Sequence, residues 1–111
     1  MSISAISWLY LLAAGAFEIA MTTAFRYTDG LTRPLPTTAF FALGLVSFLL
    51  LNKSLAGIPL GTAYAVWTGL GAAGTAFIGI AFYNEPATTA RLALLTVLIG
   101  SIIGLKLASA D

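Results

Sequence analysis

The sequence predicts an all-α membrane protein with four transmembrane helices in a single domain, residues 1–111. Of the 111 residues, 59% are hydrophobic and only 8% are charged, whereas the wet surface of a soluble domain needs about 25% charged residues. The apolar residues form four runs, and a helix of about 20 apolar residues crosses the hydrocarbon core of a bilayer. Charged residues, prolines and glycines, which are typical of turns, separate the runs.

The first two spans are predicted at residues 6–25 and 35–51. The first ends at the charged, turn-forming segment 26–30. Because it has no basic region ahead of it and continues past Glu18, it is interpreted as a retained span rather than a signal peptide. Two prolines favour an extended connection before the second span, which is predicted to stop at the polar residues 52–53.

The last two spans are predicted at residues 59–82 and 88–107, with Pro59 in the first turn of the third. Several glycines weaken the third helix, but in a membrane they permit close helix approach. In the fourth helix, Gly100 and Gly104 lie four residues apart on one face. This spacing predicts a helix-pairing face at a dimer contact, and the alternative is packing within one chain.

Composition excludes several classes of function. The chain has no cysteine and no histidine, so disulfides, thiol chemistry and the commonest metal ligand are absent. We expect no metal, no cofactor and no nucleic-acid partner, since the net charge of +1 forms no basic patch. An enzyme is not expected either, because no nucleophile with a base, metal set or phosphate loop is found.

Lysine and arginine counts give no firm orientation. In a four-span protein the first and third connections share one side and carry Arg26, Arg33 and Arg91, while the other side has Lys53 and Lys106. The positive-inside rule needs a larger difference than this. Insertion in both orientations is therefore compatible with the sequence, and an antiparallel dimer could then form from one chain, as in the inverted halves of many alternating-access transporters.

Glu18 is the acidic residue that lies inside a span, because Asp29, Glu85 and Asp111 fall in connections or at the terminus. A charge at that depth costs about 2.5–3.5 kcal/mol on the more lenient insertion scales, and intramembrane carboxylates are usually functional. Since burial favours the neutral form of a carboxyl group, we expect a proton and a cation to compete for Glu18. The alternative is that Glu18 pairs with Lys106 or a hydroxyl and only stabilises the helix bundle.

Three residues share the face of Glu18 on the first helix, at a spacing of three or four positions: Gly15, Met21 and Thr22. They are predicted to line a site around the carboxylate. Thr22 can donate to that carboxylate or to its own backbone, which is the commoner fate of a membrane threonine. Ser47, in the second span, has the same two choices.

Tyr64 and Trp67 lie three residues apart in the third span and can form one aromatic face. Aromatic rings bind organic cations through their π faces, at about 0.5–2 kcal/mol. The alternative is that both rings pack at an interface or anchor the helix in the bilayer.

Taken together, these segments resemble the small multidrug resistance family of four-helix, proton-coupled exporters over nearly the whole chain. The resemblance rests on AGAFE at 14–18, YTDGLTRPLP at 27–36, VSF at 46–48, IPLGTAYAVWTGLGA at 58–72, NEP at 84–86 and IIGLK at 102–106. It implies an antiparallel, dual-topology homodimer in the bacterial plasma (inner) membrane, or a heterodimer as in some relatives.

The resemblance also implies roles for individual residues. The two copies of Glu18 would share one site and exchange protons for an organic cation. Tyr64 and Trp67 would line this site, Ser47 would hydrogen-bond near the carboxylate, and the two glycines of the fourth helix would form the dimer contact.

Within the family, WTGLGA and GLK resemble the guanidinium exporter branch, which usually has a tryptophan three residues after the glutamate. This sequence has Met21 there, followed by Thr22 and Thr23 as in the multidrug branch. A flexible methionine could admit more hydrophobic cations. The prediction is export of guanidinium-type cations with a broadened range; the alternatives are a quaternary-ammonium exporter and a non-transporting assembly subunit in which Glu18 only packs.

Overall fold

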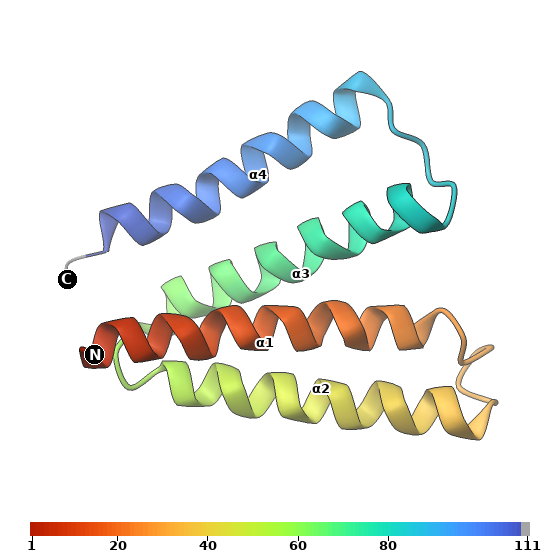
Figure 1. The fold of residues 1–111 in the computed structure, drawn as a ribbon, viewed down its shortest axis with the longest axis horizontal. Coiled ribbons are helices and arrows are strands. Elements are labelled where there is room, and N and C mark those ends of the chain that lie inside the picture. The colour runs from red at the N-terminus through yellow and green to blue at the C-terminus, as the bar shows by residue number, and fades with distance from the viewer. Residues whose placement is uncertain (110–111) are drawn as a thin grey trace.

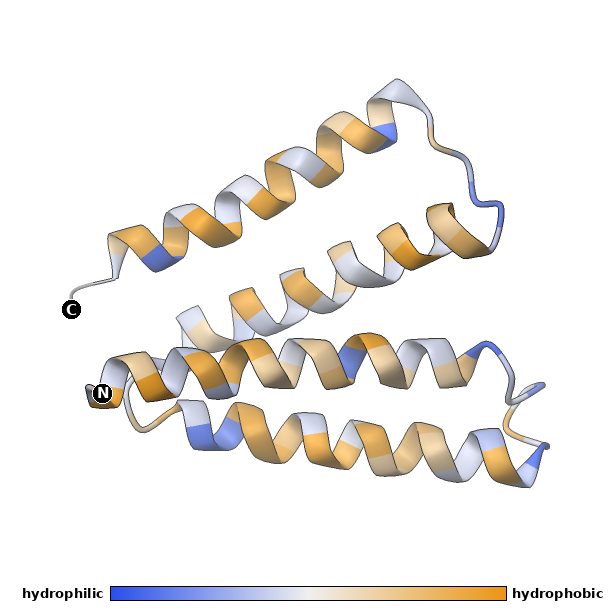
Figure 2. Cartoon of the chain, in the orientation of Figure 1, coloured by the Kyte–Doolittle hydropathy of each residue, from blue (hydrophilic) through white to orange (hydrophobic). Residues whose placement is uncertain are grey.

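The computed structural model describes residues 1–109, which fold into four helices: α1 (Ile3–Phe25), α2 (Pro34–Ser54), α3 (Leu60–Phe82) and α4 (Thr89–Ala108) (Figure 1). All four are long and apolar enough to cross a membrane. Even the shortest, α4 with 20 residues, spans about 30 Å, the thickness of the hydrocarbon core. The hydrophilic positions gather mainly near the helix ends and turns (Figure 2). The predicted four-helix membrane fold is therefore confirmed; Asp111 lies outside the described residues.

The helix ends follow local chemistry. The Ser2 hydroxyl accepts the Ala5 N–H at 3.0 Å and so caps α1. Helix α2 begins at Pro34, one residue before the predicted start, because the missing N–H of proline costs nothing in a first turn. It continues past the predicted end at Leu51 to Ser54, whose hydroxyl donates to the Leu51 carbonyl at 2.6 Å. Polar residues at 52–53 thus end the apolar run but not the helix.

Helix α1 is central, since it packs against both α2 and α3, while α4 packs against α3. Helices α3 and α4 are both inclined to α1 and α2 (Figure 1). Ile102 of α4 lies on Gly69 of α3, where a Cβ would be 3.0 Å from the Ile102 Cδ1. The apolar core gathers at the end of the bundle where α1 begins, and its buried members are Trp8, Leu11, Ala14, Leu51, Ile58, Ala63, Val66 and Ile102.

Polar contacts join the helices at the opposite end. The Glu85 carboxylate, in the connection from α3 to α4, pairs with Arg26 at 2.7 Å and with Arg91 at 3.4 Å. The Arg26 guanidinium also lies 4.1 Å from the centroid of the Tyr83 ring. Hydrogen bonds first from Arg26 and then from Arg91 hold the pKa of Glu85 below its ordinary value. The first and third connections therefore meet on one side of the protein.

Candidate functional site

The Glu18 carboxylate lies against the backbone of α3 at Gly71. A Cβ at that position would overlap the carboxylate, so only glycine leaves this space free. The Oε1 atom is buried and accepts no hydrogen bond from any of residues 1–109. A buried polar atom without a partner is costly, and a proton or a bound cation would remove that cost. The geometry therefore leaves one carboxylate oxygen without a partner among the described residues.

Ser47 and Trp67 connect three helices beside Glu18. The Ser47 hydroxyl is buried; it donates to the Ala14 carbonyl at 2.6 Å and accepts the Trp67 indole N–H at 2.9 Å. In an α-helix the carbonyl of residue 14 is also the acceptor for the N–H of residue 18. The network thus fixes the turn of α1 that carries Glu18, and Ser47 bonds to the backbone rather than to the carboxylate.

The aromatic rings lie around this network. Trp67 is 5.7 Å from Tyr64 and 6.4 Å from Phe48, measured between ring centroids. Tyr64 is 55% exposed, so it lies on an outer face of α3 rather than among the three packed helices. Trp67 therefore adjoins both the hydrogen-bonded network and two exposed rings.

Thr22 is hydrogen-bonded one turn beyond Glu18. Its hydroxyl donates to the Ile19 carbonyl at 2.9 Å and shares a 2.7 Å bond with the Thr75 hydroxyl of α3. Because the Thr22 hydroxyl donates its hydrogen to the Ile19 carbonyl, Thr75 is the donor in the bond between the two threonines. Thr22 consequently ties α1 to α3 and does not bond to the Glu18 carboxylate in this arrangement.

Met21 and Gly15 pack between helices. The Met21 sulfur would be 2.8 Å from a Cβ at Gly44, so this glycine makes room for the methionine between α1 and α2. A Cβ at Gly15 would be 2.9 Å from Leu70 Cδ1 on α3. Both residues are on the helix that carries Glu18, and they contact Gly44 of α2 and Leu70 of α3, respectively.

The predicted residues of α4 lie apart from Glu18. Lys106 is at the far end of α4, where its ammonium is 5.2 Å from the centroid of the Trp8 ring. A Cβ added at Gly100 or Gly104 would meet nothing within 4 Å. The glycine face of α4 is therefore open, and Lys106 does not neutralise Glu18.

Sequence reasoning missed Gly71, Gly44 and Thr75 as individual residues of this region. The abundance of glycine in the third span indicated close helix approach, but only the rotation of α3 against α1 identifies which glycine faces the carboxylate. The part of the chain that the structure describes contains no cluster of three residues that could bind a metal ion.

The profile of the family described as Small Multidrug Resistance protein matches residues 6–98. The chain belongs to the small multidrug resistance family. Among relatives of this small multidrug resistance protein, a guanidinium exporter of Proteus vulgaris is 45% identical over 103 residues, which are 93% of this chain and 99% of the relative. Guanidinium exporters of Citrobacter freundii, at 44% identity, and Salmonella typhimurium strain LT2, at 41%, each match over 93% of this chain and 98% of their own length.

Family membership confirms the broad class of this protein. A small multidrug resistance protein with four membrane-spanning helices is a transporter rather than an enzyme. It is a multi-pass membrane protein, consistent with the bacterial inner membrane.

Proposed function

We propose that this small multidrug resistance protein is a proton-coupled antiporter that exports small organic cations of the guanidinium type. The observation that carries the proposal is the Glu18 carboxylate, which lies within a membrane-spanning helix with one buried oxygen that no other described residue satisfies. The guanidinium exporters among the relatives, at 41–45% identity, support the choice of cation.

Exchange follows from the chemistry of a single carboxylate. A guanidinium ion is planar and presents N–H donors in a fork that matches two carboxylate oxygens. A proton on Glu18 removes the negative charge that holds this cation, so the two ligands exclude each other. Inward movement of protons then drives cations outward. If two chains place their Glu18 residues in one cavity, the carboxylates titrate as a pair.

The surrounding residues are proposed to position this carboxylate. The bonds from Trp67 to Ser47 and from Ser47 to the Ala14 carbonyl hold three helices in register beside Glu18. The rings of Tyr64 and Trp67 lie next to each other on α3, with centroids 5.7 Å apart, where they can contact a cation. Gly71 supplies the space in which the carboxylate lies.

We also propose that the working unit is an antiparallel dual-topology dimer that pairs through α4. Val97 is 64% exposed, and with Gly100 and Gly104 it lies at helical spacing along one face. An open small-residue face of this kind allows two backbones to approach closely. A homodimer is proposed, with a heterodimer of two family members as the alternative.

The second candidate is a broader quaternary-ammonium exporter. The observation that favours it is Met21, which occupies the position of an aromatic N–H donor in the guanidinium branch and packs on Gly44. A thioether is flexible and makes only weak hydrogen bonds, so the neighbourhood of Glu18 is less tightly fixed. Larger apolar cations would then be accepted along with guanidinium.

Transport by the purified protein in liposomes tests the proposal. An outward-directed gradient of protons should drive guanidinium uptake into the vesicles. Glu18→Gln should abolish this uptake, because an amide cannot exchange a proton, while Glu85→Gln, a matched change in a connection, should retain it. Uptake by Glu18→Gln at the rate of the unmodified protein would refute the role of the carboxylate.

Substrate range is tested in the same vesicles with guanidinium and tetrapropylammonium. Transport of guanidinium alone supports a selective exporter. Transport of both supports a broadened site around Met21, and transport of tetrapropylammonium alone would replace the first candidate by the second.

A further inference from the structure

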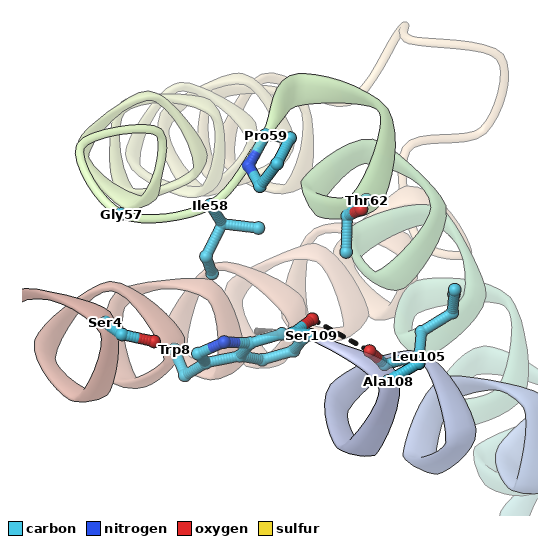
Figure 3. A pocket seen from close by; sticks show the side chains of 9 residues that line it. All are labelled: Ser4, Trp8, Gly57, Ile58, Pro59, Thr62, Leu105, Ala108 and Ser109. Carbon is cyan, nitrogen blue, oxygen red and sulfur yellow. Dashed lines mark hydrogen bonds between the residues drawn. The ribbon is translucent and has the colours of Figure 1, made fainter. Parts of the chain in front are cut away.

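Two adjacent cavities open at the end of the bundle where α1 begins and α4 ends. The first has a volume of about 260 Å³ and is lined in part by the hydroxyl residues Ser4, Thr62 and Ser109 (Figure 3). The second has a volume of about 200 Å³ and is lined by apolar side chains, Val66 among them, together with Lys106. Trp8 lines both cavities, so they adjoin each other at its side chain, and we refer to the pair, which lies between α1, α3 and α4, as the crevice.

The polarity of this crevice changes with depth. Helices α1 and α3 begin, and α4 ends, at this end of the bundle, so the hydroxyl-lined cavity lies near the level of lipid headgroups. The apolar cavity extends to Leu12, two turns further along α1 than Ser4, which is the level of acyl chains. A molecule with a polar head and an apolar tail, oriented like a bilayer lipid, matches both parts.

The charged side chains around the crevice determine whether the polar head of the bound molecule is an anion or a cation. Lys106 lies 5.2 Å from the Trp8 ring centroid, and its long stem can carry the ammonium toward the membrane surface. The acidic side chains in residues 1–109 are elsewhere: Glu18 within α1, and Asp29 and Glu85 in the connections at the opposite end. Lys106 therefore gives the crevice a positive charge that attracts an anion.

We propose that this crevice binds an anionic phospholipid from the surrounding bilayer. The phosphate lies near Lys106 and the hydroxyls of Ser4 and Thr62, and an acyl chain lies against the exposed Leu12 and Ile103 side chains of the apolar cavity. The Ser109 hydroxyl donates to the Leu105 carbonyl at 2.8 Å (Figure 3), so it lines the site without offering its hydrogen to the phosphate.

Native mass spectrometry of the purified protein tests this site. The probes are phosphatidylglycerol and phosphatidylcholine with identical acyl chains, and the readout is the lipid bound per chain. We expect preferential binding of phosphatidylglycerol, and a loss of about 5-fold in its affinity in Lys106→Gln, from the usual effect of one lysine near an anionic membrane surface.

Lys53→Gln is the matched control, because it removes the same charge at the same end of the bundle. Lys53 lies 5.7 Å from the Tyr10 ring centroid and lines neither cavity. Its variant should bind phosphatidylglycerol as the unmodified protein does. Equal losses in both variants, equal binding of the two lipids, or displacement of phosphatidylglycerol by an equal concentration of glycerol phosphate would each overturn the proposal.

Discussion

Replacing Gly71 by alanine tests whether the position of the Glu18 carboxylate matters for transport. The new Cβ would overlap the carboxylate, so the Glu18 side chain must move while the backbone of both helices can stay in place. Gly74→Ala is the matched control on the same helix. Its Cβ would overlap the Ile19 side chain, which is apolar and adjoins Glu18 on α1.

Gly71→Ala should reduce transport but leave stability nearly unchanged, whereas Gly74→Ala should reduce stability but leave transport nearly unchanged. Alanine favours a helix by about 1 kcal/mol relative to glycine, and moving the flexible Glu18 side chain costs about 0.5–1.5 kcal/mol, so Gly71→Ala should leave the free energy of unfolding nearly unchanged. Ile19 is β-branched and nearly fixed in a helix. Overpacking it should cost about 1–3 kcal/mol, so Gly74→Ala should be the less stable variant.

For transport, the larger loss is expected in Gly71→Ala. A misplacement of about 1 Å in a reacting group can reduce a rate about 100-fold, so we expect a 10- to 100-fold loss of proton-driven guanidinium uptake in Gly71→Ala. Gly74→Ala should transport at nearly the unmodified rate. Unfolding is measured in detergent micelles, and uptake is measured in liposomes with equal amounts of inserted protein. Normal uptake by Gly71→Ala would refute the reasoning, and so would an equal loss in both variants.

Two further predictions follow from the polar contacts. Ser47→Ala should lower the free energy of unfolding by about 1–3 kcal/mol, because the Trp67 indole N–H loses its acceptor; a smaller loss when Trp67→Phe is already present would confirm the coupling, and additive losses would argue against it. The pKa of Glu85, measured by carboxyl NMR in micelles, should lie below its ordinary 4.5 and rise in Arg26→Gln. The ion pairs of Glu85 then stabilise the protein above pH 4.5, and this stabilisation is lost as the pH falls through the lower pKa of Glu85 in the folded protein. Equal Glu85 pKa values in the unmodified protein and in Arg26→Gln would exclude Arg26 as the cause.

Much of the fold could be predicted because lipid imposes simple rules on a sequence. Four long apolar runs must be helices, since only helices satisfy their own backbone groups in a bilayer. Helix α1 begins three residues before its predicted start, and α2 ends three residues after its predicted end. The end of α2 was hard to predict because a helix can continue through polar residues once it reaches the membrane surface. Its last residue, Ser54, bonds back to the Leu51 carbonyl and belongs to the helix.

The sequence by itself determined that Glu18 is a carboxylate inside a membrane, because its position in an apolar run requires no knowledge of packing. Only the tertiary structure decided what surrounds it. The rotation of α3 against α1 places Gly71 at the carboxylate and Thr75 at Thr22, and the approach of α2 brings Ser47 to the Ala14 carbonyl. Helical periodicity gives the face of a residue on its own helix, but the partner across an interface depends on the relative rotation and shift of two helices, which shape complementarity fixes.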